Sequence, residues 1–183
     1  MYLRPNAMKY LLNNQQSERL HFRPIQSSDF DEWLQFFTDP EYYKYWVAEK
    51  DIPEAECRKW YANQFNRYEK NLGGMNALIE KSSGALVGHA GLLVQVVDGI
   101  EELEIAYSLQ PHFRGKGFAT EAAQTIKEFA FANKFSPSLI SIISLTNLPS
   151  QKVAVKNGMK IEKQTVYKDN PVYIFRIFNP IID

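Results

Sequence analysis

Residues 114–119, with the sequence Arg-Gly-Lys-Gly-Phe-Ala, form the segment of the chain best suited to binding an anion. Gly115 and Gly117 allow the backbone to turn tightly and leave its N–H groups unshielded. A helix is predicted to start near Gly117, and the first turn of a helix adds unpaired N–H donors and a partial positive charge. Arg114 and Lys116 strengthen the local attraction. The segment is therefore a candidate phosphate site, although a glycine turn that only caps a helix has the same composition.

Two common phosphate-binding motifs do not fit this segment. A Rossmann fingerprint needs a third glycine where Thr120 stands, and it normally lies at the first strand-to-helix turn. A Walker loop needs serine or threonine directly after its Gly-Lys pair, but Gly117 follows Gly115 and Lys116 here. A nucleotide-binding regulator of another design stays open at this point.

The elements that position this segment are predicted from apolar periodicity and from turn residues. Seven strands are expected, at residues 20–25, 76–80, 86–97, 103–109, 139–145, 160–167 and 172–178. The strands at 86–97 and 103–109 form a hairpin around Asp98-Gly99. Four helices are expected, at residues 30–38, 53–72, 117–135 and 149–156. The pattern predicts one α/β domain, with the candidate loop between a strand pair and a long helix.

Composition limits the class of protein. The chain has 183 residues with 45% hydrophobic content, enough for one substantial core. It has 21 basic and 21 acidic residues, so no overall field attracts nucleic acid or anionic lipid. No apolar run reaches the length of a membrane span. We therefore expect neither a nucleic-acid partner nor a membrane partner.

The single cysteine and the scattered histidines argue against redox and metal chemistry. Cys57 excludes a disulfide within the chain and fits a reducing, cytoplasmic compartment. It lies on an apolar stripe of the predicted helix at 53–72, which favours a buried structural thiol. His21, His89 and His112 lack metal-ligand spacing, so no metal is predicted.

Arg114, Gly117 and Ala119 form the pattern Arg-x-x-Gly-x-Ala, which closely resembles the acetyl-coenzyme A loop of the GNAT acetyltransferases. The resemblance covers roughly residues 19–178. It consists of five blocks in the order of the RimJ/RimL-like branch, which acetylates ribosomal proteins: Thr38-Asp39-Pro40-Glu41, Glu104-Ile105-Ala106-Tyr107, residues 115–121, Asn147-x-x-Ser150 and Lys156-Asn157-Gly158-Met159.

This resemblance implies the GNAT fold, an α/β fold with a mixed, mostly antiparallel central sheet of about seven strands and helices on both faces. We expect an N-terminal extension at residues 1–18, loosely held, before a single domain at residues 19–183. The resemblance to the GNAT family also implies acetyl-CoA as co-substrate. The backbone amides of residues 115–119 would bind the pyrophosphate, and the strand at 105–109 would splay to pair with pantetheine and polarise the acetyl carbonyl. The implied coenzyme-binding residues are Ile105, Ala106, Tyr107, Ser108, Leu109, Arg114, Gly115, Lys116, Gly117, Phe118, Ala119, Thr120, Asn147 and Ser150.

The implied reaction is transfer of the acetyl group to a primary amine, on a protein N-terminus or a small molecule, by direct attack. Glu104 is the candidate general base by similarity, and a solvated cross-strand charge is the other interpretation of that residue. Many GNAT enzymes protonate the leaving thiolate with a tyrosine where this chain has Ala154. Ser150 is the substitute acid, and a helix cap is its other interpretation.

The missing tyrosine leaves a second class of function open, an acyl-CoA-binding module or sensor without turnover. The aromatic cluster at residues 42–46 is expected to be core or a wall of the acceptor pocket, since no basic patch accompanies it. A monomer and a homodimer both stay open.

Overall fold

The computed structural model describes residues 9–46 and 51–180. Its seven-stranded sheet has the strand order β1-β2-β3-β4-β5-β7-β6. The strands are β1 (Leu20–Pro24), β2 (Gly73–Glu80), β3 (Leu86–Val97), β4 (Ile100–Leu109), β5 (Ser138–Ser144), β6 (Lys160–Tyr167) and β7 (Asn170–Phe178). The helices are α1 (Phe30–Thr38), α2 (Pro53–Glu69), α3 (Phe118–Ala132) and α4 (Leu148–Lys156), with short 3-10 turns η2 (Ser27–Asp29), η3 (Pro40–Tyr43) and η4 (Pro111–Phe113). The α/β architecture and the seven strands agree with the sequence prediction.

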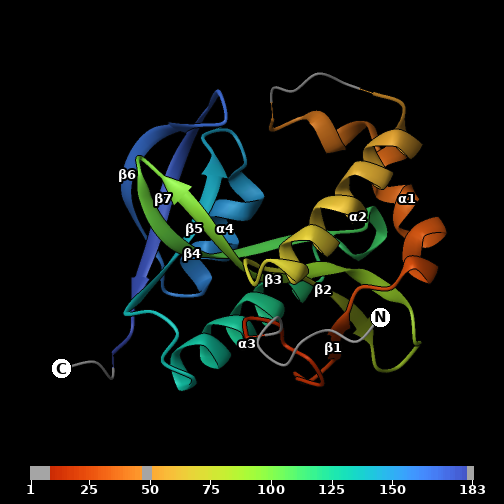
Figure 1. Ribbon diagram of the computed structural model, residues 1–183, viewed down its shortest axis with the longest axis horizontal. Helices are drawn as coiled ribbons and strands as arrows, with labels where there is room; N and C mark the ends of the chain where they lie inside the picture. Colours follow the sequence, from red (N-terminus) through yellow and green to blue (C-terminus); the bar gives the residue numbers. More distant parts are fainter. Residues whose placement is uncertain (1–8, 47–50, 181–183) are drawn as a thin grey trace.

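Helices cover both faces of the sheet, with α1 and α2 on one side and α3 on the other (Figure 1). Two neighbouring residues of β2 illustrate how both faces are covered, since successive side chains of a strand point to opposite faces of the sheet. Ala77 packs in a core with Trp33 of α1 and Cys57 of α2, whereas Leu78 packs in a second core with Ile126 of α3. The two cores hold the helices in fixed positions on either side of the strands.

The strands β4 and β5 form the only parallel pair of the described sheet, and their pairing stops almost at once. Glu104 of β4 is in register with Ile140 of β5, and the two strands share no further register position. On its other side β4 stays paired with β3 as far as Leu109. The sheet therefore opens between β4 and β5 beyond Glu104.

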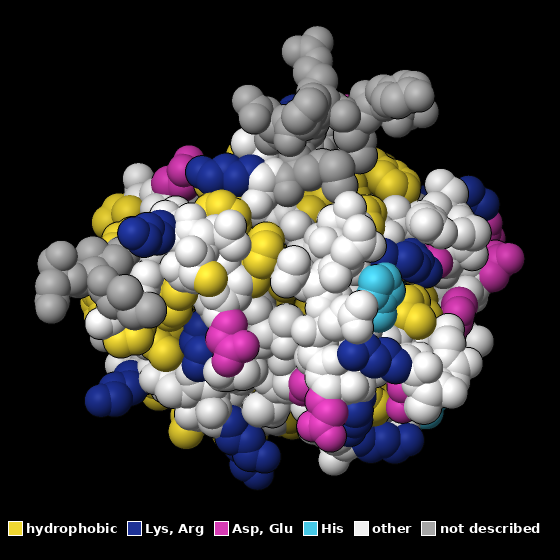
Figure 2. All heavy atoms as spheres, turned by 90° about the horizontal axis from the view of Figure 1, so that it is seen from below, with side chains coloured by type: hydrophobic (Ala, Val, Ile, Leu, Met, Phe, Trp, Pro, Cys, Tyr) yellow, Lys and Arg dark blue, Asp and Glu magenta, His cyan; other side chains and the backbone are white. Residues whose placement is uncertain are grey.

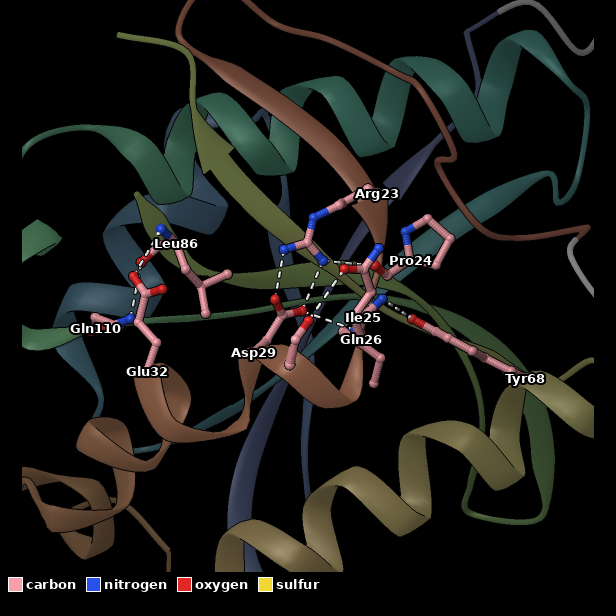
Figure 3. Close-up of polar contacts among 10 residues, drawn as sticks. Arg23, Pro24, Ile25, Gln26, Asp29, Glu32, Tyr68, Leu86 and Gln110 are labelled. Carbon is pink, nitrogen blue, oxygen red and sulfur yellow. Dashed lines mark hydrogen bonds and ion pairs between the residues drawn. The ribbon is translucent and has the colours of Figure 1, made fainter. Parts of the chain in front are cut away.

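A polar network joins β1 to α1 and α2 (Figure 3). The guanidinium of Arg23 donates to both carboxylate oxygens of Asp29, at 2.8 and 2.7 Å, and the backbone N–H of Gln26 donates to the same carboxylate at 2.9 Å. The Tyr68 hydroxyl of α2 accepts from the N–H of Ile25 and donates to a carbonyl of β2. These bonds fix the entry of α1 and hold α2 against the sheet.

Residues 10–12 are packed against the domain, and for them the expectation of a loosely held extension is wrong. Leu11 and Leu12 are buried, and the N–H of Leu12 donates to Oδ1 of Asn76 at 3.1 Å. The Tyr10 ring meets the edge of Phe135 with ring centroids 5.2 Å apart. Apolar burial at two adjacent positions outweighs the polar composition of the neighbouring residues. The domain boundary placed at residue 18 stays a prediction, and residues 1–8 and 181–183 lie outside the described part of the chain.

The sequence predicts that Gly73 and Gly74 end the helix before them. In the structure these two glycines are the first residues of β2. They pair with Leu93 and Leu92 of β3. A side chain on Gly73 would place its Cβ 2.0 Å from the carbonyl oxygen of Leu92, so the strands approach closely only because glycine stands there.

Charges of both signs are mixed on the surface. Figure 2 shows Lys and Arg side chains interspersed with Asp and Glu on the face seen from below Figure 1. Among residues 9–46 and 51–180, no helix combines the length and the apolar character needed to cross a bilayer.

Candidate active site

A cleft of about 1060 Å³ lies where β4 and β5 separate. Residues from α1, η3 and α2 form one wall. The loop at 114–117, the first turn of α3, α4 and the end of β6 form the others. A smaller adjoining cavity of about 180 Å³ lies between β4 and β5 themselves. The larger cleft brings together most of the predicted site residues: Glu104, Tyr107, Ser108, Leu109, Arg114, Gly115, Gly117, Phe118, Ala119, Thr120, Asn147 and Ser150. Ile105 and Ala106 line the smaller cavity, and Lys116 lines neither.

The loop before α3 presents unused backbone donors. Gly115 and Gly117 have φ angles of 74° and 85°, in the left-handed region that glycine adopts without penalty. Gly117 is the N-cap residue of α3. The amides of residues 115–120 donate no hydrogen bond to any residue that the structure describes, whereas the amide of Glu121 donates to the Gly117 carbonyl. Unpaired donors at the N-terminus of a 15-residue helix are suited to binding an anion.

Arg114 is already paired with a carboxylate. One of its terminal nitrogens lies 2.5 Å from Oδ2 of Asp39, and its Nε donates to the Leu109 carbonyl at 3.1 Å. Lys116 is exposed, with its Nζ 5.6 Å from the centre of the Phe113 ring. Arg114 is therefore engaged and Lys116 does not line the cleft, so the free donors on the cleft side are the backbone amides.

Glu104 lies at the point where the sheet opens, and it is 8% exposed. Its Oε2 accepts a hydrogen bond from the Gln95 amide at 2.8 Å, and its Oε1 accepts from the N–H of Ile142 at 3.4 Å. Burial raises the pKa of the Glu104 carboxyl, while these two hydrogen bonds and the charges of Arg67 and Lys168 oppose that rise. The alternative of a solvated cross-strand charge is wrong, because the carboxyl is buried and lines the cleft.

Two residues beside Glu104 were not singled out in the sequence. Tyr167, the last residue of β6, donates from its hydroxyl to Oε1 of Gln95 at 3.0 Å, so that Tyr167, Gln95 and Glu104 form a chain of hydrogen bonds. Gln95 and Glu104 face each other across the β3–β4 hairpin near the register pair Gln95–Glu102. The register of the β3–β4 hairpin could have predicted that Gln95 lies near Glu104. No local sequence pattern predicts that Tyr167 of β6 lies there as well.

Asn147, Ser150 and Tyr107 meet at the wall formed by α4. Oδ1 of Asn147 accepts from the N–H of Ser150 at 3.1 Å, so Asn147 is the N-cap of α4 and the interpretation of Ser150 as that cap is wrong. The Tyr107 hydroxyl donates to the Ser150 carbonyl at 2.9 Å. Burial raises the pKa of Tyr107, which keeps its hydroxyl protonated.

The backbone of β4 faces the opening at alternate residues. The Ile105 carbonyl accepts from Oγ of Ser141 on β5 at 2.8 Å, so the peptide groups of Ile105 point toward β5. Residues two apart along a strand present their N–H and C=O groups to the same side. The peptide groups of Tyr107 therefore face the opening, where no register pair with β5 exists.

Aromatic side chains form the opposite wall. Phe36, Tyr42, Tyr45, Trp46 and Trp60 line the cleft. The ring of Tyr42 meets that of Phe36 edge to face with centroids 5.1 Å apart. The cluster predicted at residues 42–46 thus lies at the cleft, and residues 47–50 are outside the described part of the chain.

Cys57 and His89 are buried away from the cleft lining. Burial raises the pKa of the Cys57 thiol to about 12, which keeps it protonated and agrees with the predicted structural role. His89 lies between Trp33 and Trp60, with ring centroids 4.2 and 4.7 Å away, and burial lowers its pKa to about 3. Within the described ranges, no three His, Cys, Asp or Glu side chains gather where they could hold a metal ion.

The model of the acetyltransferase (GNAT) domain family matches residues 19–160. The chain belongs to this family. The uncharacterised N-acetyltransferase YnaD of Bacillus subtilis (strain 168) is 29% identical over 161 residues, which cover 84% of this chain and 88% of YnaD. The predicted GNAT fold and the prediction of an acetyltransferase are confirmed at the level of the family.

Solved structures show the same fold at low sequence identity. An acetyltransferase from Agrobacterium tumefaciens str. C58 superposes with a TM-score of 0.75 at 21% identity, covering 91% of this chain and 94% of that one. RimL, a ribosomal L7/L12 α-N-protein acetyltransferase in complex with coenzyme A, gives 0.71 at 15% identity, covering 90% and 97%. A ribosomal-protein-S5-alanine acetyltransferase from Vibrio fischeri gives 0.71 at 17% identity, covering 92% and 98%.

Proposed function

We propose that this GNAT family member transfers the acetyl group of acetyl-CoA to a primary amine by direct attack, without a covalent enzyme intermediate. One observation carries the proposal: the unpaired amides of residues 115–120 open into a cleft that runs between β4 and β5 to a buried carboxyl, Glu104. The coenzyme A complex of RimL, which shares the fold, supports coenzyme A as the ligand of this cleft.

The cleft suits the three parts of acetyl-CoA. The diphosphate lies on the loop amides at the N-terminus of α3, where the helix dipole favours negative charge. The pantetheine arm follows residues 105–109 of β4, between the strand and Asn147. The N–H of Tyr107 faces the gap and donates to the acetyl oxygen. A donor fixed beside a developing oxyanion stabilises the transition state by roughly 3 to 4 kcal/mol.

The reaction then needs two proton transfers. The uncharged amine attacks the acetyl carbon, a C–N bond forms, and the C–S bond breaks with its electron pair on sulfur. Glu104 takes the proton that the amine loses, directly or through a water molecule. Ser150 gives a proton to the leaving thiolate, and the Tyr107 hydroxyl positions Ser150 by holding its carbonyl. The product is an N-acetyl amine and free coenzyme A.

The acceptor half of the cleft favours an amine on an apolar or aromatic group. Aromatic rings dominate that wall, and the exposed carboxylate of Glu41 is neutralised by Lys44 at 2.6 Å. Lys168 offsets the charge of Glu104 in the same region. The described residues therefore offer no excess of carboxylates to a polycation, and cation–π contacts suit a single ammonium group. A peptide N-terminus remains within this class, in keeping with the RimJ/RimL-like motifs.

A thiol-release assay tests the proposal. Acetyl-CoA is offered with phenethylamine, an alkylamine, peptides with apolar N-termini, spermidine and an aminoglycoside, while calorimetry measures binding of acetyl-CoA alone. We expect thiol release with monoamines or peptides and little with the polycations. Binding of acetyl-CoA without release for any amine would favour the acyl-CoA-binding module, and preference for ATP or a dinucleotide over coenzyme A would refute the assignment of the loop.

A further inference from the structure

Arg19, the residue before β1, contacts the candidate diphosphate loop from behind. Its terminal nitrogen donates to the carbonyl of Lys116 at 3.0 Å, and its guanidinium carbon lies 4.1 Å from the centre of the Phe118 ring. A Cβ on Gly117 would lie 3.3 Å from the other terminal nitrogen. Gly117 and Phe118 line the cleft, whereas Arg19 and Lys116 do not. Arg19 therefore supports the loop on the side away from the cleft.

The contact with Lys116 determines where the next amide points. In a trans peptide the C=O and the following N–H point in opposite directions, because the unit is planar. The structure contains no cis peptide bond in its described part. When Arg19 holds the Lys116 carbonyl behind the loop, the N–H of Gly117 is turned to the cleft side.

Arg19 also neutralises a carboxylate beside the site. Its Nε donates to Oε2 of Glu121 at 2.7 Å, and its backbone N–H donates to Oε1 at 2.7 Å. Ser17 donates to the same Oε1 at 2.6 Å. Burial opposes ionisation of Glu121, but these bonds outweigh it and lower the pKa of its carboxyl. Glu121 is thus ionised in the first turn of α3, where an unpaired carboxylate would repel a phosphate.

We propose that Arg19 is a positioning residue for the diphosphate: its planar fork fixes the Lys116 carbonyl and pairs Glu121, so that the loop amides stay directed at the coenzyme. This inference rests on the proposed function, since it assigns Arg19 to the coenzyme site of that reaction. Lysine at this position would keep the charge but not the fork that reaches a carbonyl and a carboxylate together. Arg19 acts only through the loop, so its effect is confined to donors that carry a diphosphate.

Two acetyl donors separate this role from a general loss of structure. Arg19→Ala, Arg19→Lys and the wild type are compared with acetyl-CoA and with acetyl-pantetheine, which lacks the diphosphate. We expect Arg19→Ala to raise the KM for acetyl-CoA and the calorimetric Kd for coenzyme A about tenfold, the loss of one charge-assisted contact network. The KM for acetyl-pantetheine and the kcat for both donors stay near wild type, and Arg19→Lys restores only part of the affinity.

Arg23→Ala is the matched control, because Arg23 makes a similar fork to a carboxylate, Asp29, at the other end of β1 (Figure 3). It is expected to lower the melting temperature without changing the preference between the two donors. Arg19→Gln is a second variant if Arg19→Ala does not fold, and it is expected to weaken the binding of acetyl-CoA selectively as well, because a neutral amide leaves the charge of Glu121 unpaired.

Failure of the inference differs from failure of the proposed function. If the wild type binds no coenzyme A, the proposed function is wrong. The role given to Arg19 is overturned if the wild type binds coenzyme A but the Arg19 variants keep the wild-type ratio of the KM values for the two donors. Equal rises of both KM values leave that ratio unchanged and count as this outcome. A lysine variant with full wild-type affinity would also overturn it, since charge alone would then suffice.

Discussion

At the scale of single residues, Glu104 is the carboxyl that we propose as the general base, and its surroundings affect its pKa in opposite directions. Burial raises the pKa of its carboxyl, and the hydrogen bonds from Gln95 and Ile142 oppose that rise. A base must be ionised to accept a proton, so the proposed activity requires a pH above this raised pKa. The rate should therefore fall as the pH drops through it.

Glu104→Gln removes the base and keeps the shape. We expect kcat/KM to fall by about 100-fold at neutral pH, the usual contribution of a general base. The acid limb that Glu104 causes in the pH profile of kcat/KM should disappear, leaving only the titration of the amine. Profiles of both proteins between pH 5 and pH 9 check this, and an unaltered limb would remove Glu104 from the mechanism.

Gln95→Leu removes a donor that stabilises the charged form of Glu104. The pKa of Glu104 should rise further, so the acid limb moves to higher pH and activity at pH 6 falls more than activity at pH 8. Tyr167→Phe, which frees Gln95 from its partner, should move the limb in the same direction by less. Gln164→Leu, an exposed change on β6, is the control. Equal losses at both pH values would show that Gln95 acts on structure alone.

His89 makes stability depend on pH. Burial lowers its pKa to about 3, below the ordinary 6.5, so as the pH falls the unfolded chain takes up this proton first. The contribution of neutral His89 to the free energy of unfolding is fully present above about pH 6.5. It is lost at roughly 1.4 kcal/mol per pH unit as the pH falls from there toward the folded pKa of about 3. His89→Leu should remove this part of the slope in urea unfolding, and exposed His112→Leu should not. Identical slopes for wild type and His89→Leu would contradict the assignment.

At the scale of elements, the loop before α3 was the part of the site that local sequence specifies best. Gly115 and Gly117 mark positive φ angles, and the apolar period of α3 begins directly after them. The Asp98-Gly99 turn could equally be predicted from the sequence, and both of its residues have positive φ. Each of these features depends on a few consecutive residues.

Gly117→Val tests the loop against a matched turn. Gly117 and Gly99 have φ angles of 85° and 79°, so valine costs each roughly 1 to 2 kcal/mol of backbone strain. Only Gly117 adjoins the cleft, and a Cβ at Gly99 would meet nothing within 4 Å. We expect Gly117→Val to weaken acetyl-CoA binding tenfold or more, and Gly99→Val to leave it unchanged, both measured by calorimetry. Equal affinities in the two variants would contradict the loop assignment.

The parts that sequence did not predict depend on contacts between distant elements. Tyr167 meets Gln95 across 72 positions, and Arg114 meets Asp39 across 75. No period or turn rule encodes such pairs, since they arise from how β6 and η3 pack on the sheet. Asn147 is an exception, because asparagine is a preferred N-cap residue and Pro149 in the next turn marks a helix start after it.

At the scale of the whole molecule, the sheet consists of two halves that share one register position, Glu104–Ile140. Arg176 of β7 connects them. Its guanidinium lies 2.6 Å from Glu102 of β4 and 2.8 Å from Glu162 of β6, and it donates to Oγ of Ser138 on β5 at 2.7 Å. These side-chain bonds join the two halves on the side of the Glu104–Ile140 pair away from the opening.

Arg176→Leu should cost about 3 kcal/mol of unfolding free energy, because it leaves the half-buried carboxylate of Glu102 without its partner. The control is Arg58→Leu, which breaks an exposed pair with Glu54 at 2.6 Å and should cost less than about 1 kcal/mol. Urea unfolding at pH 7 measures both changes. Similar costs for the two variants would mean that Arg176 does not hold the halves together.

The ion pair between Arg114 and Asp39 couples the two ends of the cleft. Asp39 accepts from Arg114 with one oxygen and from the N–H of Glu41 with the other, so the same carboxylate anchors η3, which carries Tyr42. A phosphate of the proposed donor that drew Arg114 away would release part of that anchor. In the proposed reaction we therefore expect donor binding to affect the aromatic wall, and by thermodynamic reciprocity an amine bound there would alter the affinity for the donor by the same factor.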